Sequence, residues 1–263
     1  MIGPARHRSR ISPLATANFT FHGKLAEFLS HRRRRVCFEY ACARAATLKN
    51  AIEALGVPHT EAAQFLVNGV PATLNRIVRD GDSVEVHAWE RQVVPVPPRF
   101  VADAHLGGLG RFLRMLGYDT LHENAIPDDE IRRLAHEERR IVLTRDRELL
   151  KCREIYFGCY VHALKPEAQL REVSARFDLA AHARPFTLCL CCNLLLDQAT
   201  EQQVRAYAPE PVLEIHRVFH RCAGCGRIYW EGSHFARMRA VLQDKFGFPP
   251  PSATPPQAAR MVE

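Results

Sequence analysis

Two stretches decide the fold of this chain, FVADAHLGGLGRFLRMLGYDT at residues 100–120 and DDEIRRLAHEERRIVLTRDRELL at residues 128–150. The first begins with a short apolar run that predicts a buried strand, and its leucines then recur at helical spacing up to Gly117. The second predicts a helix from about Asp128 that leads into an apolar strand at 141–143. Strands that alternate with helices are typical of a parallel sheet covered by helices.

The same alternation continues around these stretches. Residues 118–122 predict a second strand, residues 155–161 predict a fourth, and Pro166 opens a further helix. Three prolines in RQVVPVPP, residues 91–98, predict an extended, stiff linker, so the flanking parts are expected to be separate domains. The expected order is a disordered tail at 1–16, a small α+β domain at 17–90, the linker at 91–98, the α/β domain at 99–184, a cysteine-containing module at 185–245 and a disordered tail at 246–263.

The small first domain shows a different pattern. Alternating apolar residues predict strands near 19–21 and 36–40, and Thr47 is a suitable N-cap for the helix that follows. Two more strands are expected at 65–67 and 84–86, the first leading into an Asn-Gly turn. Two strands, a helix and two strands make a compact α+β fold.

Composition narrows the class of protein. The chain has 263 residues, of which 47% are hydrophobic and 25% charged, and no apolar stretch approaches the ~20 residues that span a bilayer, so we expect a soluble protein without a membrane partner. The nine cysteines include two C-x-x-C pairs, which favours a reducing, cytoplasmic location. Most of the +7 net charge lies in residues 1–98, where four arginines run together at 32–35. Such a run fits either phosphate contact with RNA or a solvated loop.

Three acids of the α/β domain follow predicted strands. Asp103 comes directly after the first, Asp128 opens the helix after the second, and Asp146 comes after the third. Because the carboxyl ends of parallel strands meet at one edge, where such folds bind ligands, we expect these carboxylates to lie close together. Oxygen ligands of this kind suit Mg²⁺ or Mn²⁺, although each acid alone could simply cap a helix. Arg111 and Arg145 lie near these acids in sequence and are candidates for phosphate contact or for plain solvation.

The four cysteines of the two C-x-x-C pairs predict one structural zinc ion. They are Cys189, Cys192, Cys222 and Cys225, and Cys191 is the spare thiol between the first two. Two such turns supply the tetrahedral sulfur ligands that zinc requires, and a four-sulfur site leaves no position for a catalytic water. A redox pair and an iron–sulfur cluster are the alternatives. Trp230 lies among cations just after the second pair, so it is a candidate to stack on RNA bases or to pack the module onto its neighbour.

Two family resemblances fit these residues. The quoted stretches, with the run LTRD at 143–146, resemble the PIN-like ribonuclease family named for the C-terminal part of the nematode Mut-seven protein, over about residues 99–240 including the zinc ribbon. FLVNGVPA and VRDGDSVEV, within residues 65–86, resemble ubiquitin-like β-grasp domains related to small sulfur carriers. A carrier would end in a free Gly-Gly, whereas this segment runs on into Trp89, so we expect an interaction domain with a protein partner or a role in positioning RNA.

The first resemblance implies a metal-dependent ribonuclease. Carried over by position, Asp103, Asp128, Glu130 and Asp146 would hold the catalytic Mg²⁺ or Mn²⁺. Related domains often have a further acid after the fourth strand, and only Glu148 offers a weak substitute here. We therefore expect hydrolysis of RNA phosphodiester bonds. The alternative is a non-catalytic RNA- or ribosome-binding protein with a degenerate nuclease fold.

Overall fold

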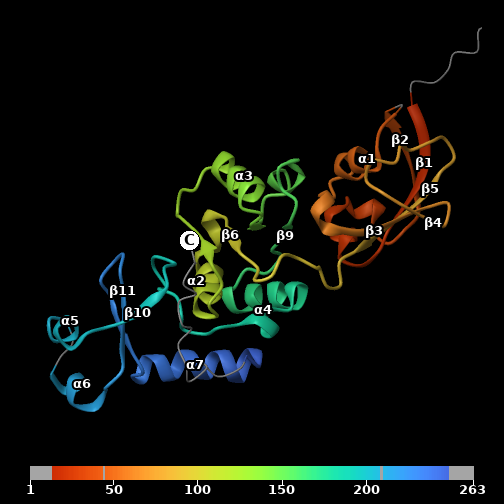
Figure 1. Ribbon diagram of the computed structural model, residues 1–263. Helices are drawn as coiled ribbons and strands as arrows, with labels where there is room; N and C mark the ends of the chain where they lie inside the picture. Colours follow the sequence, from red (N-terminus) through yellow and green to blue (C-terminus); the bar gives the residue numbers. More distant parts are fainter. Residues whose placement is uncertain (1–13, 44, 208–209, 249–263) are drawn as a thin grey trace, which may run out of the picture. The chain divides into compact units, whose positions relative to one another are not determined.

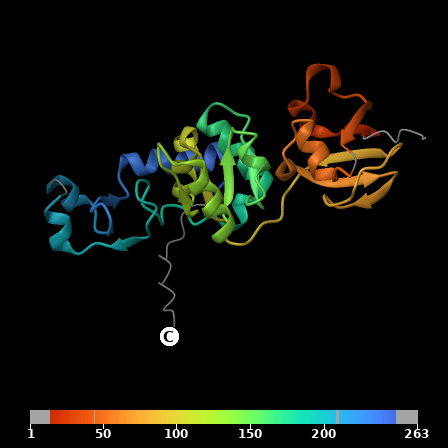
Figure 2. The ribbon, with the colours of Figure 1, turned by 90° about the horizontal axis from the view of Figure 1, so that it is seen from above.

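The computed structural model describes residues 14–43, 45–207 and 210–248, in two compact units that divide between Trp89 and Glu90 (Figures 1 and 2). The fold is of the mixed α+β class, as the sequence predicts. None of the helices in the described ranges is long and apolar enough to cross a membrane.

The first unit is a five-stranded sheet in the order β2-β1-β5-β3-β4, with one α-helix and three 3₁₀ turns. Its elements are β1 (Leu14–Phe21), η1 (Gly23–Phe28), η2 (His31–Arg33), β2 (Phe38–Ala43), α1 (Leu48–Ala54), η3 (His59–Glu61), β3 (Ala62–Val67), β4 (Val70–Ala72) and β5 (Ser83–Ala88). The central strands β1 and β5 are parallel, and the other pairs are antiparallel. Thr47 caps α1 by accepting a hydrogen bond from the backbone N–H of Asn50, as expected.

Two details of this unit correct the sequence-based expectations. The sheet has a fifth strand, β4, which pairs with β3 across the Asn-Gly turn. Its three residues include a proline, which hides the strand from pattern analysis because proline is rare inside strands. Strand β1 also begins at Leu14, inside the stretch that we expected to be a disordered tail. The remainder of that stretch, residues 1–13, lies outside the described residues.

The second unit contains a four-stranded, all-parallel sheet in the order β7-β6-β8-β9. Its elements are β6 (Phe100–Ala102), η4 (Ala104–Leu106), α2 (Gly107–Met115), β7 (Thr120–Leu121), α3 (Asp128–Glu137), β8 (Ile141–Thr144), η5 (Leu149–Lys151), β9 (Gly158–Tyr160), α4 (Pro166–Phe177) and η6 (Leu179–His182). Each of the four predicted strands and each helix of the α/β domain is present. The strands at 118–122 and 155–161 are shorter than expected.

Helices cover both faces of this sheet. Leucines of α2 and the apolar side of α4 pack on one face, against Phe100 and Leu143. On the other face α3 and η5 pack against Val101 and Val142 (Figure 1). From β6 the chain passes through α2 on one face of the sheet to β7. From β7 it passes through α3 on the other face to β8. The gap between the carboxyl ends of β6 and β8 is therefore the topological switch point, where open parallel sheets bind ligands.

A smaller antiparallel sheet follows, in the order β10-β11-β12. Its elements are β10 (Leu196–Gln198), α5 (Glu201–Arg205), α6 (Glu210–Ile215), β11 (Phe219–Cys222), β12 (Ile228–Trp230) and α7 (Ser233–Phe246). The long helix α7 is not predicted by the sequence pattern. It ends at Phe246, and both Leu242 and the following Phe248 are buried in the core beside α2 and α4. The described chain thus continues as folded structure past residue 245, where we expected a disordered tail, and residues 249–263 lie outside the described part.

The proline-rich segment is partly bound to the second unit. The backbone N–H of Gln92 donates to the carbonyl of Arg176 in α4 at 2.8 Å, and the Arg176 Nε donates to the Gln92 side chain at 3.0 Å. Arg91 forms an ion pair with Asp178 at 2.7 Å. The start of the predicted stiff linker therefore lies against α4, because its polar groups find hydrogen-bond partners there.

Gly117 gives a test of how the end of α2 packs against the segment that leads into the cysteine-containing module. It ends α2 with φ +83°, and a Cβ atom there would lie 2.1 Å from the backbone oxygen of Arg184. Gly247, with φ +65° and nothing within 4 Å of an added Cβ, is the matched control. We expect Gly247→Ala to cost about 1–2 kcal/mol from the left-handed backbone alone. Gly117→Ala should cost about 3 kcal/mol or more, since a backbone segment must also move. Urea unfolding of both variants measures the difference, and equal costs would contradict this packing.

Candidate active site and zinc centre

The carboxyl ends of β6 and β8 form what we call the acidic edge, built from Asp103, Thr144 and Asp146. The register pairs Ala102 with Leu143, so Asp103 and Thr144 follow at the same level of the sheet. The backbone N–H of Asp103 donates to the carbonyl of Leu143 at 2.9 Å, which fixes the first acid at the end of its strand. The structure thus places Asp103 and Asp146 on either side of the switch point.

The Thr144 hydroxyl joins the two acids. It donates to Asp103 Oδ2 at 2.7 Å and accepts from the backbone N–H of Asp146 at 2.9 Å. Thr144 is fully buried, whereas Asp103 is half-buried and Asp146 exposed, so the two carboxylates open toward solvent from a rigid base. Asp146 also caps the next turn, because its Oδ1 accepts from the N–H of Glu148 at 2.7 Å and of Leu149 at 3.3 Å. A capping role and a metal-binding role are compatible, since the second carboxylate oxygen takes no part in the cap.

The acids of α3 are placed differently. Asp128 is exposed and lies near η5, where burial raises the pKa of the Cys152 thiol and the charge of Asp128 contributes. Both oxygens of Glu130 accept hydrogen bonds from Arg133, at 2.7 and 2.8 Å, and these bonds lower the pKa of Glu130. Among the described residues, no three of the four acids predicted for the metal site have carboxylate oxygens within 4.8 Å of one another. The arrangement therefore joins Asp103 with Asp146 and does not bring Asp128 and Glu130 into a common cluster with them.

Pattern analysis missed three residues at the carboxyl ends of the four parallel strands. One is Thr144, and a second is His122 after β7, whose Nε2 lies 3.2 Å from the carbonyl oxygen of Ala104. The third is Glu172 of α4, whose Oε2 accepts from the backbone N–H of His162 at 3.1 Å and of Ala163 at 3.0 Å, just beyond β9. Glu172 is thus an acid at the end of the fourth strand. The only sequence signal for it is an acid in the second turn of the helix that follows.

Glu148, the weak substitute for an acid after the fourth strand, is exposed and pairs with a lysine. Its side chain is 78% exposed and pairs with Lys151 at 2.6 Å. The arginine candidates Arg111 and Arg145 are both exposed, which leaves them accessible to a phosphate. Trp230 is half-buried and packs with Phe219 of the same small sheet at a ring-centroid distance of 6.3 Å, a contact that favours neither RNA stacking nor packing onto the neighbouring domain.

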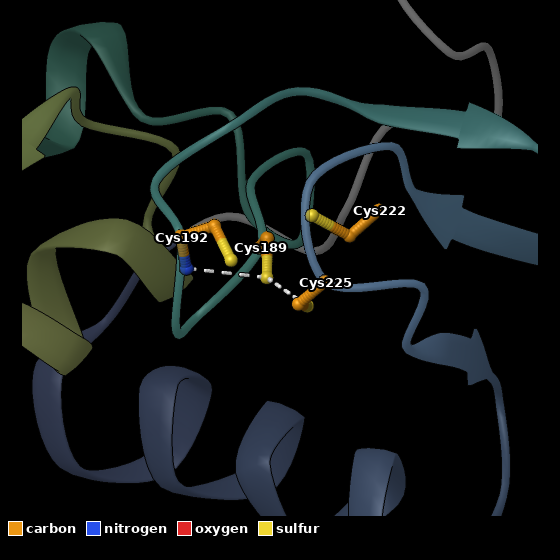
Figure 3. A group of neighbouring side chains, drawn as sticks. All are labelled: Cys189, Cys192, Cys222 and Cys225. Atoms are coloured by element: carbon orange, nitrogen blue, oxygen red, sulfur yellow. Dashed lines mark hydrogen bonds between the residues drawn. The ribbon is translucent and has the colours of Figure 1, made fainter.

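The four cysteines of the C-x-x-C pairs come together as predicted, and we call them the zinc cluster (Figure 3). Their sulfur atoms all lie within 4.8 Å of one another, and those of Cys189 and Cys225 are 3.7 Å apart. Tetrahedral zinc with Zn–S bonds of about 2.3 Å requires sulfur atoms roughly 3.8 Å apart. The cluster could therefore bind zinc with little rearrangement. Cys191 is exposed, as expected for the spare thiol.

The two cysteine turns have the same backbone design. The N–H of Cys189 bonds to the carbonyl of Leu194, and the N–H of Cys222 bonds to the carbonyl of Arg227 in the equivalent place. The residue after each pair adopts a left-handed conformation, with φ +62° at Asn193 and φ +72° at Gly226. Glycine and asparagine are the residues that adopt it most readily, so the sequence suits both turns.

Hydrogen bonds prepare two of these sulfur atoms for a cation. A backbone N–H bond from Arg227 lowers the pKa of Cys225 to about 6. At Cys189 burial acts to raise the pKa, but hydrogen bonds led by the Tyr229 hydroxyl, 3.1 Å away, leave it lowered. A hydrogen bond with Cys225 raises the pKa of Cys192. Thiolates are the ligands that zinc binds.

The first cysteine turn is fixed to the parallel sheet. Buried Arg114 of α2 donates to the carbonyls of Leu190 and Cys191, at 3.2 and 2.8 Å. Asn193 accepts from the Thr120 N–H of β7 at 2.8 Å and donates to Asp119 at 2.6 Å. These bonds connect the geometry of the zinc cluster to that of the sheet.

Comparison with known families agrees with both parts of the chain. Residues 98–242 match the model of the Mut7-C RNAse domain, and residues 14–94 match that of the Mut7-C ubiquitin domain. The family resemblances seen in the sequence are thereby confirmed. Searches of curated proteins and of solved structures found no significant match.

Proposed function

The chain belongs to the Mut7-C RNAse domain family, and from this premise we propose that it is a ribonuclease that hydrolyses RNA phosphodiester bonds with Mg²⁺ or Mn²⁺. The single observation that best supports this is the position of Asp103 and Asp146 at the topological switch point, where one buried hydroxyl donates to the Asp103 carboxylate and accepts from the backbone N–H of Asp146. Open parallel sheets bind their ligands at this place.

The residues present fit a small divalent ion. Mg²⁺ keeps several of its waters and is usually bound by only one or two carboxylates together with substrate phosphates, so Asp103 and Asp146 match the usual number of protein ligands. When bound, such an ion would lower the pKa of a water and stabilise charge on the phosphate oxygens. Thr144 fixes the orientation of Asp103, and Arg145 and Arg111 are exposed near the acids in sequence, where they could hold the RNA backbone. Asp128 and Glu130 remain further proposed ligands, and Glu130 would first have to leave Arg133.

We further propose that the zinc cluster holds a structural zinc ion and that the protein works in the cytoplasm. A reducing compartment keeps its thiols available. The second candidate function is RNA or ribosome binding without cleavage. It is favoured by one observation, that no three of the four proposed acids converge within the described structure.

Metal-dependent cleavage tests the proposal directly. Purified protein is incubated with single-stranded, structured and transfer RNAs, with and without Mn²⁺ or Mg²⁺. Because a chelator can also remove zinc, the metal-free sample omits the divalent ions instead, and its zinc content is measured. We expect cleavage only with the added ion. RNA that stays intact but bound would favour the non-cutting protein.

A further inference from the structure

The first unit carries a cluster of metal-binding side chains, in a different unit of the chain from the acidic edge. It consists of His22, Glu85 and His87, which we call the His–Glu cluster. We propose that it binds one divalent transition-metal ion of the Zn²⁺ class, through two imidazoles and one carboxylate. This site does not depend on the proposed nuclease activity.

The sheet register places these three side chains together. Strands β1 and β5 are parallel, with Thr20 opposite Glu85 and Phe21 opposite Val86. His22 follows in this register beside His87, and its backbone N–H bonds to the carbonyl of Val86 at 2.9 Å. Because side chains alternate along a strand, Phe21 and Val86 point into the core, and the cluster lies on the opposite face. Strand geometry therefore holds the ligands in position.

The distances suit a metal ion. His22 Nε2 lies 3.3 Å from Glu85 Oε2, and His87 Nε2 lies 3.9 Å from the same oxygen. Ligands at about 2.0–2.1 Å from a tetrahedral ion lie roughly 3.3 Å apart. One ligand pair already has this spacing, and the second needs to close by a fraction of an ångström. The third pair, between the two imidazoles, lies within 4.8 Å.

Hydrogen bonds do not satisfy all three side chains of the His–Glu cluster. The carboxylate is within hydrogen-bond distance of His22 alone, and the Nε2 of His87 is buried with no hydrogen-bond partner in the described part of the chain. Leaving a buried polar atom unpaired costs free energy, and one ion between the three side chains would satisfy it. The two imidazole rings are stacked, with centroids 4.2 Å apart, so each must turn for its lone pair to meet the ion. Side chains that are 41% and 34% exposed have room for that rotation.

The donor types select the class of ion. Two imidazoles and one carboxylate suit Zn²⁺, Cu²⁺ or Ni²⁺, whereas Mg²⁺ and Ca²⁺ prefer oxygen ligands throughout. Three protein ligands also leave a position for water. The ion would connect the end of β1 with β5 and so stabilise the central pair of strands in this sheet.

Zinc titration of the full chain tests the site. Protein that already holds zinc in its cysteines is titrated with Zn²⁺ by calorimetry, and cobalt spectra distinguish the sites because only cysteine ligands give a thiolate charge-transfer band. We expect one further equivalent to bind, and binding at least about 10-fold weaker in His22→Asn, His87→Asn and Glu85→Gln. His31→Asn, an exposed histidine of the same unit, is the control and should bind like wild type. The melting temperature should rise with added zinc in wild type and in the control only.

Two outcomes would overturn the site. One is wild-type protein that takes up no zinc beyond its cysteine-bound equivalent. The other is undiminished uptake by folded His22→Asn and His87→Asn variants. RNA cleavage does not enter this test, so its result is independent of the nuclease proposal.

Discussion

Replacing Cys222 with serine is expected to abolish binding of the proposed zinc ion and to unfold the antiparallel sheet of residues 196–230. Cys222 is fully buried at the end of β11, and its sulfur belongs to the zinc cluster. Structural zinc supplies about 10–16 kcal/mol of apparent binding free energy in small zinc-binding domains, and the three short strands here have few buried apolar residues of their own. Elemental analysis should show the loss of one equivalent, and hydrogen exchange should show loss of amide protection in β10, β11 and β12.

The effect should reach the parallel sheet as well. Asn193 and the carbonyl of Cys191 bond to β7 and α2, so release of the first cysteine turn removes hydrogen bonds from both. Cys191→Ser is the matched control, because this exposed thiol lies beside the cluster without belonging to it. It should keep its zinc and its melting temperature. A Cys222→Ser protein with a full equivalent of zinc would show that the ligand set is wrong.

The sequence predicts the parallel sheet and its helices well because the local signals agree there. Strands β6 and β8 are short apolar runs bounded by polar residues, and helices α2 and α3 each have a clear apolar side. Helix α7 has no such local signal in its sequence. Its buried residue Leu242 packs against α2 and α4 rather than forming a strong stripe of its own, so its position depends on tertiary contacts. Strand β4 is missed because three residues with a central proline show no alternation of apolar and polar side chains.

The candidate active site also contains some residues that the sequence predicts and others that it does not. Asp103 and Asp146 are visible in the sequence because each follows a short apolar run that predicts a strand. The role of Thr144 follows from the register between β6 and β8, which no single stretch encodes. Glu172 lies on helix α4 and contacts the chain just beyond β9, which no strand pattern predicts. Whether Glu130 binds a metal ion depends on whether its carboxylate leaves Arg133. The His–Glu cluster likewise joins residues more than sixty positions apart and appears only once β1 and β5 pair.

Asp103→Asn should lower metal-dependent RNA cleavage by roughly 100-fold or more while leaving the fold intact. The asparagine oxygen can still accept the hydrogen bond from the Thr144 hydroxyl, so this part-buried hydrogen bond survives and only the negative charge is lost. Outer-shell partners of metal ligands already cost about 10- to 100-fold when mutated, so loss of a direct ligand should cost at least as much. Asp146→Asn should behave alike, because its amide oxygen can still cap the turn at Glu148. Initial rates across a Mn²⁺ series, with melting temperatures, measure both effects.

Glu148→Gln serves as the control for these two variants. Glu148 carries the same charge close to Asp146 in sequence, but its carboxylate is exposed and paired with Lys151, so its loss should change the rate by only a few-fold. Glu130→Gln then decides the role of the α3 acids. A large loss would mean that Glu130 leaves Arg133 to bind the ion, and a small one would restrict the metal ligands to the ends of β6 and β8. Wild-type rates in both Asp103→Asn and Asp146→Asn would instead show that the acidic edge is not where RNA is cut.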